Sequence, residues 1–244
     1  MNDSFHVKIG GRVEVLDDAN ALAARAADFI ADIMRGCAAP FRFCLAGGGT
    51  PRATYKILAR RNDVAWDCTE LFFGDERFVP PDHPHSNYRM AQASLLAGGN
   101  VHPRALFAMP TDGTPQSGAD AYEEILRQQY GASVLDPAVP LFDLMLLGLG
   151  DDGHTASLIP GQPVLQERTR WVAPVPQGRK EVRLTLTYLA LESSRVTLFL
   201  VSGADKAEAV ARVRGGDATL PAGALKPQGE VIWLLDRAEA NGEP

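Results

Sequence analysis

Hydrophobic positions along the chain follow two patterns that alternate. Short continuous apolar runs, of which 141–147 and 196–201 are the clearest, are typical of strands buried on both faces of a sheet. Between such runs, apolar residues recur at helical spacing, as over 22–33, which is typical of a helix with one buried face. This alternation predicts an α/β fold, here a mostly parallel, doubly wound, Rossmann-like sheet with helices on both faces.

Turn-forming and capping residues set the expected bounds of these elements. We expect strands at 12–16, 41–46, 70–73, 141–147, 196–201 and 231–235. We expect helices from Asp17 or Asp18 to Gly36, from Pro51 through Leu58, from Ser86 through Leu96, at 119–130 and at 204–213. The stretch 98–118, rich in Gly, Pro and Thr, is short enough to be a surface loop, so we expect a single domain over 1–244.

The composition narrows the classes of function. Of the 244 residues, 45% are hydrophobic and 22% charged, as in ordinary globular proteins, and the formal net charge is −6. An acidic chain offers no general electrostatic surface for nucleic acid. No apolar run approaches the ~20 residues that span a bilayer, and residues 1–10 lack the pattern of a secretory signal. We therefore expect no nucleic-acid or membrane partner.

The three cysteines are Cys37, Cys44 and Cys68. None forms a C-x-x-C pair, and their odd number argues against a disulfide framework. The sequence therefore predicts free thiols and a reducing, cytoplasmic setting.

Ligands of open parallel sheets bind beyond the carboxyl ends of the strands, so we expect chemistry in the loops there. The first such loop spans 46–51. Its glycines Gly47, Gly48 and Gly49 expose backbone N–H groups, Thr50 adds a hydroxyl, and the following helix offers the positive end of its dipole. These features suit a phosphate cradle, although they also suit a plain tight turn.

The second loop, 74–80, follows an apolar strand directly. Charged side chains at such a position need partners, so Asp75 and Arg77 either pair with each other or serve a site. His83 and His85 do not indicate a metal, because a proline separates them and no cysteine or helical histidine spacing completes a ligand set.

The third loop, 147–157, contains G-x-G-x-x-G, the pattern of dinucleotide-binding folds. Asp151 and Asp152 inside the turn would repel a pyrophosphate, and Pro160 interrupts any long helix, so the pattern does not indicate such a fold. The glycines instead bend the chain so that His154 stands at the end of a buried strand beside acidic residues. A lone histidine is more often structural, but this setting favours a functional role.

Together these loops resemble the 6-phosphogluconolactonase family, within the wider group of sugar-phosphate isomerases and deaminases. The resemblance is carried by the segments 45–51, 73–80 with 86–87, 142–148, 152–158, 183–187 and 201–206, which occur in order over most of the chain. It implies hydrolysis of 6-phospho-D-glucono-1,5-lactone to 6-phosphogluconate, the second step of the oxidative pentose phosphate pathway. It also implies that no metal and no organic cofactor take part.

The resemblance further implies roles for individual residues. His154 would act as the base, with Asp75 and Arg77 in the same catalytic site. The phosphate would be held by Gly47, Gly48, Gly49, Thr50, Arg183 and Lys206. Lactone hydrolysis needs an activated water and a stabilised oxyanion, which a histidine and either Arg77 or loop N–H groups supply. Ser157 is expected in a helical turn rather than as a nucleophile, because the chain has no G-x-S-x-G elbow.

The nearest alternative is an aldose–ketose isomerase or an amino-sugar phosphate deaminase. In deaminases of similar fold the histidine loop continues as Phe-Asn-Glu, whereas 157–159 here read Ser-Leu-Ile, and Arg77 stands where the deaminases carry Tyr. Both departures favour the lactonase. A sugar-phosphate sensor would need a DNA-binding module, for which we find no basic N-terminal segment, and a nicotinamide-dependent redox enzyme is the third alternative. The sequence predicts no particular oligomeric state.

Overall fold

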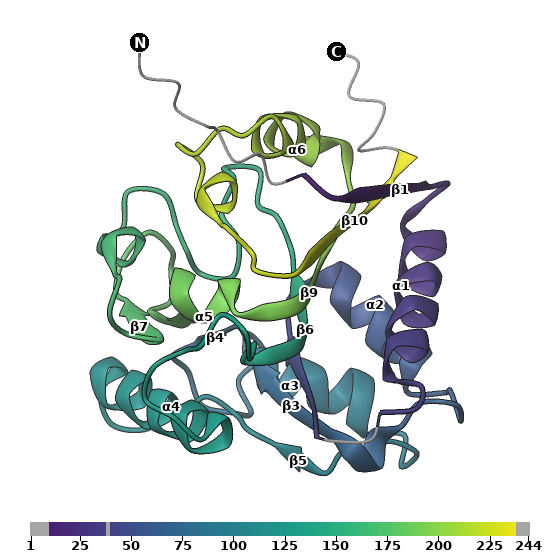
Figure 1. The fold of residues 1–244 in the computed structure, drawn as a ribbon, viewed down its shortest axis with the longest axis horizontal. Coiled ribbons are helices and arrows are strands. Elements are labelled where there is room, and N and C mark those ends of the chain that lie inside the picture. Colours follow the sequence, from purple (N-terminus) through teal and green to yellow (C-terminus); the bar gives the residue numbers. More distant parts are fainter. Residues whose placement is uncertain (1–9, 38–39, 238–244) are drawn as a thin grey trace.

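The computed structural model describes residues 10–37 and 40–237, so the expectation about a secretory signal lies almost wholly outside the described residues. Its centre is a seven-stranded sheet (Figure 1). In spatial order the strands are β1 (Arg12–Leu16), β10 (Glu230–Asp236), β9 (Ser194–Val201), β6 (Phe142–Leu147), β2 (Phe41–Leu45), β3 (Thr69–Phe73) and β5 (Ala105–Leu106). Every pairing in this sheet is parallel, which confirms the predicted fold class.

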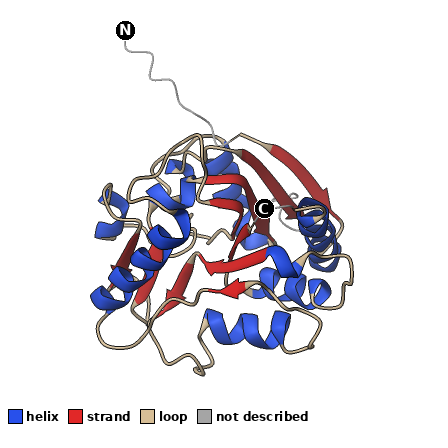
Figure 2. Cartoon of the chain, turned by 60° about the horizontal axis from the view of Figure 1, so that its bottom comes forward, coloured by secondary structure: helices blue, strands red, loops and turns tan. Residues whose placement is uncertain are grey.

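Helices cover both faces of this sheet. They are α1 (Ala19–Met34), α2 (Gly49–Leu58), α3 (Asn87–Ala91), α4 (Pro115–Tyr130), α5 (Tyr188–Glu192) and α6 (Ala207–Arg214). Helices α1 and α2 pack against each other on one side, and α4 lies on the other side (Figures 1 and 2). The strand order reverses between β2 and β6, because the chain proceeds from β2 to β3 in one direction and from β6 to β9 in the other. A ligand crevice is expected at this point of a doubly wound sheet.

A second sheet, antiparallel and in the order β4-β8-β7, was not predicted. It consists of β4 (Asp75–Arg77), β8 (Arg183–Leu186) and β7 (Val172–Val175), and α4 packs against it. The sequence predicts a loop over 74–80, directly after a strand. Residues 75–77 of this stretch are extended instead, because β4 pairs with β8, which lies far along the chain.

Several other bounds differ from those expected. Helix α2 begins at Gly49, so Pro51 is its third residue. The stretch 98–118 contains β5 and the first turn of α4. The expected helix at 204–213 divides into a 3₁₀ turn, Ala204–Lys206, and α6. Ser86 caps α3 as expected, and a π-helical segment, Gln92–Leu96, continues it. Further 3₁₀ turns lie at Trp66–Cys68, Pro163–Gln166 and Ala222–Ala224.

The prediction of free thiols is wrong for two of the three cysteines. Cys37, after α1, and Cys68, before β3, form a disulfide whose Cα atoms are 6.8 Å apart. No short motif indicates this pairing, because it is the fold that brings the two segments together. Cys44 is free and buried, and burial raises the pKa of its thiol. The disulfide removes the basis for predicting a reducing compartment, so the cytoplasmic location stays a prediction.

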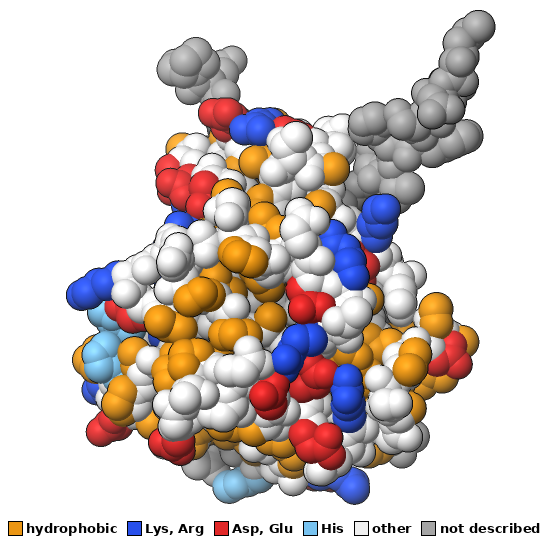
Figure 3. Space-filling view, turned by 90° about the vertical axis from the view of Figure 1, so that its left-hand side faces the viewer, with side chains coloured by type: hydrophobic (Ala, Val, Ile, Leu, Met, Phe, Trp, Pro, Cys, Tyr) orange, Lys and Arg blue, Asp and Glu red, His pale blue; other side chains and the backbone are white. Residues whose placement is uncertain are grey.

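The described surface mixes side chains of both charges. On the face shown in Figure 3, Lys and Arg stand among Asp and Glu, and hydrophobic side chains gather near the centre. No described helix is both long enough and apolar enough to cross a membrane.

Two buried tyrosines tie strand ends to the helices behind them. The Tyr55 hydroxyl accepts a hydrogen bond from the Ala46 N–H and donates to the Ala46 carbonyl, both at 2.9 Å. The Tyr122 hydroxyl likewise accepts from the Phe73 N–H at 2.9 Å and donates to the Phe73 carbonyl. Burial raises the pKa of both phenols. Each bond satisfies backbone groups at the point where the chain leaves the sheet.

We predict that Tyr55→Phe lowers the free energy of unfolding by about 1–3 kcal/mol, because it leaves the backbone groups of Ala46 without partners. Urea denaturation measures this loss. Tyr88→Phe is the matched control, because its hydroxyl contacts only the Gln92 side chain among the described residues. An equal loss in both variants would contradict the role assigned to Tyr55.

Candidate active site

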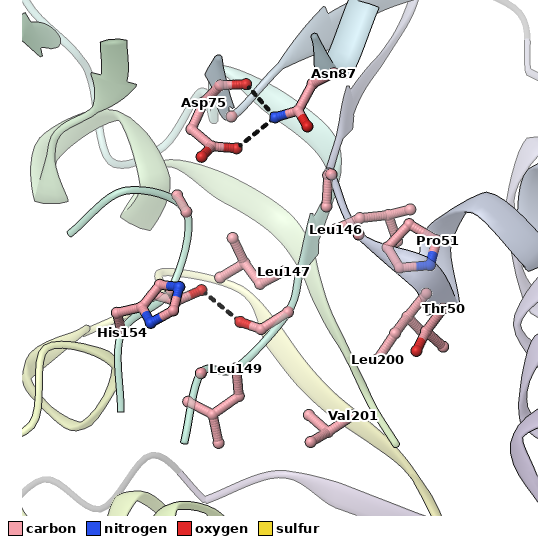
Figure 4. Close-up of a pocket in the computed structure, with 18 of the residues that line it drawn as sticks. Thr50, Pro51, Asp75, Asn87, Leu146, Leu147, Leu149, His154, Leu200 and Val201 are labelled. Atoms are coloured by element: carbon pink, nitrogen blue, oxygen red, sulfur yellow. Dashed lines mark hydrogen bonds between the residues drawn. The ribbon is translucent and has the colours of Figure 1, made fainter. Parts of the chain in front are cut away.

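A cavity of about 450 Å³ lies at the carboxyl ends of β2, β3, β6 and β9. It therefore occupies the point where the strand order reverses. Figure 4 shows His154 and Thr50 on opposite sides of this cavity and Asp75 at one end. All nine residues that the sequence placed in the site line it, namely Gly47, Gly48, Gly49, Thr50, Asp75, Arg77, His154, Arg183 and Lys206. The loops thus converge as expected, while the role of each residue stays a prediction.

The glycine loop and the start of α2 form one wall of the cavity. Gly48 is the N-cap of α2 with φ 112°, a conformation that favours glycine, and no side chain caps the helix. The N–H groups of Gly49 and Thr50 are therefore left for a ligand. Helix dipole and free N–H groups together make this wall suited to an anion.

The Asp75 carboxylate connects three of the surrounding segments. It is only 7% exposed. Its Oδ1 accepts from Asn87 Nδ2 at 3.0 Å, its Oδ2 accepts from Ser157 Oγ at 2.6 Å, and Arg183 Nη1 lies 3.7 Å from Oδ2. The expected alternative of a local pair with Arg77 does not hold, because Arg77 Nη1 donates to the His85 carbonyl instead.

The neighbouring carboxylate of Glu76 orders the start of α3. It accepts from the backbone N–H groups of Arg77, Asn87 and Tyr88, at 2.7, 2.7 and 2.8 Å, and from Ser86 Oγ at 3.0 Å. Burial raises the pKa of Glu76 even though these hydrogen bonds oppose the rise. These contacts hold Asn87 where it reaches Asp75.

His154 is held by a carboxylate and faced by a cation. Its Nδ1 lies 2.5 Å from Asp152 Oδ1, and Arg179 Nη2 lies 2.6 Å from Asp152 Oδ2 and 3.1 Å from the same Nδ1. Burial alone would raise the pKa of Asp152, but hydrogen bonds from Arg179 and His154 outweigh it and hold that pKa well below its usual range. Both contacts use Nδ1, so Nε2 is the imidazole nitrogen left for chemistry.

Two glycines are required by close contacts in the site. A Cβ at Gly150 would overlap His154 Nδ1, and a Cβ at Gly47 would overlap the Asn87 amide. Ala156, which lines the cavity, has φ 48°, a left-handed conformation that a residue with a Cβ rarely adopts. Strained backbone of this kind concentrates at functional sites.

The cavity holds cationic side chains with unused donors. The Nε atoms of Arg77 and Arg183 are buried and have no hydrogen-bond partner among the described residues. Burial lowers the pKa of Arg183, and the nearby Asp75 partly offsets this. Lys206 also lines the cavity, although its Nζ contacts Asp205 at 2.8 Å. The positive charges of Arg77, Arg183 and Lys206 on the cavity lining suit it to an anionic ligand.

Several residues of the site were missed by sequence reasoning. In the sequence Asp152 stands out only as an acidic neighbour of His154, and Asn87 only as part of a segment that carries the family resemblance. Arg179 carried no signal, because it lies in a loop between β7 and β8. Ser157, expected in a helical turn, lies in a non-helical one and bonds Asp75. Among the described residues, no group of three or more His, Cys, Asp or Glu side chains is arranged to hold a metal ion.

Over residues 17–233 the chain matches the family described as glucosamine-6-phosphate isomerases/6-phosphogluconolactonase, and it belongs to this family. A 6-phosphogluconolactonase of Synechocystis sp. is 41% identical over 197 residues, covering 79% of this chain and 80% of the relative. One of Nostoc sp. is 38% identical over 235 residues (93% and 95%), and the human one is 32% identical over 246 residues (94% and 93%). The predicted resemblance is confirmed, and the chain is an enzyme of this family.

Solved structures of this family have the same fold as this chain. A 6-phosphogluconolactonase from Trypanosoma cruzi superposes with a TM-score of 0.84 at 26% identity, covering 97% of this chain and 98% of that one. A monomeric glucosamine-6-phosphate deaminase superposes at 0.79 with 24% identity, covering 95% and 100%, and shows the shared fold alone. One relative, from Arabidopsis thaliana, is named chloroplastic, so family membership does not fix a compartment.

We predict that Gly150→Ala breaks the contact between His154 and Asp152, because the new methyl group would occupy the position of Nδ1. Proton NMR measures this as loss of the low-field Nδ1 proton resonance. Gly148→Ala, in the same loop, is the control, because a Cβ there would meet no atom within 4 Å. Retention of the resonance in Gly150→Ala would contradict the prediction.

Proposed function

We propose that the chain hydrolyses 6-phospho-D-glucono-1,5-lactone to 6-phosphogluconate in the oxidative pentose phosphate pathway, through a water molecule activated by His154. The observation that carries this proposal is the arrangement of His154, whose Nδ1 faces Asp152 while the ring lines a cavity rich in anion-binding groups. The names of the relatives supply the substrate class.

In the proposed reaction the phosphate binds at the start of α2, held by Gly48 to Thr50 together with Arg183 and Lys206, which line the same cavity. This grip positions the lactone ring with its carbonyl carbon near His154. Nε2 takes a proton from water as the water oxygen bonds to that carbon. Arg77 stabilises the resulting oxyanion. The bond between the carbon and the ring oxygen then breaks, and the imidazolium returns its proton to that oxygen.

The residues after His154 distinguish this reaction from deamination. Ser157 donates to Asp75, and Leu158 and Ile159 are buried hydrophobic residues, so no carboxylate stands where the deaminase loop carries its Glu. An amino-sugar deaminase needs that second acid–base group. We therefore expect no ammonia release from glucosamine 6-phosphate.

We predict that His154→Ala lowers the turnover of 6-phosphoglucono-δ-lactone at least ~10²-fold with folding intact, because the general base is lost. Acid release in a pH-stat, corrected for spontaneous hydrolysis, measures turnover, and circular dichroism monitors folding. His102→Ala, an exposed histidine outside the cavity, is the control. More than a tenth of wild-type turnover in His154→Ala would refute the assigned role.

We predict that Arg183→Gln raises KM roughly 10- to 100-fold with a smaller change in kcat, because a charge-assisted contact to the phosphate is lost. Steady-state kinetics measure this split. Arg214→Gln removes the same charge from an exposed position on α6 and should leave KM unchanged. A fall in kcat alone would place Arg183 at the reacting carbon instead.

A further inference from the structure

Arg179 reaches the imidazole site from outside the cavity lining. It lies in the loop that joins β7 to β8, and its side chain is 31% exposed. Its Nη1 donates to the Gly178 carbonyl at 2.8 Å, and its Nη2 contacts Asp152 Oδ2 and His154 Nδ1. The guanidinium is therefore fixed at both ends.

Nδ1 of His154 cannot serve both neighbours in the same way. A ring nitrogen either donates a proton or accepts one, and a guanidinium only donates. The 2.5 Å contact with the Asp152 carboxylate is shorter than the 3.1 Å contact with Arg179. Nδ1 therefore donates to Asp152, and the guanidinium stands beside it as an unbonded positive charge.

We propose that Arg179 is a positioning residue whose charge, held beside Nδ1, opposes protonation of the His154 ring and so favours the neutral, proton-accepting imidazole. Two effects of Arg179 both disfavour protonation of the ring. Its charge lies next to the ring and opposes a second positive charge there. Its ion pair with Asp152 also takes up part of the negative charge that would otherwise stabilise an imidazolium. This inference rests on the proposed function, in which His154 must be unprotonated to activate water.

Other charged groups around the ring do not replace this contact. Those that line the cavity or flank the loop are Asp75, Arg77, Asp151, Arg183 and Lys206. Of all the charged side chains described, Asp152 and Arg179 alone have a polar atom within hydrogen-bonding distance of the imidazole. Lys206 Nζ is instead 4.0 Å from Asp151 Oδ1 and 2.8 Å from Asp205. Arg179 is therefore the cation whose removal changes the immediate charge at Nδ1.

The test is Arg179→Gln, compared with Arg179→Lys and Lys180→Gln. Lysine retains the charge, and Lys180 is an exposed cation at the next position, so its variant removes one charge from the same loop without touching Asp152. Two quantities are measured for each protein. One is the midpoint of the His154 ring titration by NMR, with the resonance assigned through His154→Gln. The other is the pH profile of kcat/KM for the lactone.

For Arg179→Gln we expect the midpoint of the His154 ring titration and the acidic limb of the kcat/KM profile to move together to higher pH. The expected shift is only about 0.5 to 1 pH unit, because solvent partly screens the half-buried guanidinium. Turnover below the limb then falls roughly three- to tenfold, while kcat/KM on the alkaline plateau changes little. Arg179→Lys and Lys180→Gln should follow the wild type. A merely structural role for Arg179 would lower activity at every pH and leave both midpoints in place.

Two results would overturn the inference: unmoved midpoints in Arg179→Gln, or an equal shift in Lys180→Gln. Failure of the proposed function gives a different result, because wild-type protein would then show no lactone hydrolysis above the spontaneous rate. The ring titration is read without substrate, so it decides the role of Arg179 in either case.

Discussion

The arrangement of the cavity depends on the hydrogen bonds that the buried Asp75 carboxylate accepts. This carboxylate receives hydrogen bonds from Asn87, at the start of α3, and from Ser157, in the turn after His154, and it faces Arg183 on β8. These groups come from three distant parts of the sequence. A carboxylate largely removed from water needs such donors, and each donor in turn needs the carboxylate. This mutual requirement holds β4 of the small sheet against the start of α3 and the turn after His154.

Chemistry in the cavity then depends on charge placed at short range. One wall offers free N–H groups, whereas the opposite wall carries an imidazole bound to a carboxylate, and cationic side chains line the same cavity. The two ends suit different parts of one molecule, an anionic tail and a carbon that water attacks. Close packing preserves the contacts on which this arrangement depends. A side chain at Gly47 would displace the Asn87 amide from Asp75, and one at Gly150 would displace His154 from Asp152.

Much of this could be predicted from the sequence because local patterns carry it. Continuous apolar runs located the buried strands β6 and β9, and glycines after strands located the loop of His154 and the loop that begins α2. What the patterns missed depends on pairing between distant segments. Strand β4 has no pattern of its own, Arg179 lies in an unremarkable loop, and Cys37 meets Cys68 only in the folded chain. Such contacts need the three-dimensional arrangement, because nothing near them in the sequence specifies a partner.

The hydrogen bonds of Tyr55 to Ala46, just after β2, and of Tyr122 to Phe73, the last residue of β3, have a wider implication. They anchor the backbone immediately before the glycine loop and before Asp75, and neither phenol belongs to the reacting groups. The residues that fix the position of the loops are thus different from the residues on the loops that would take part in the reaction. A lineage with this framework can exchange a few loop residues, and with them the reaction performed, while the sheet beneath keeps its shape.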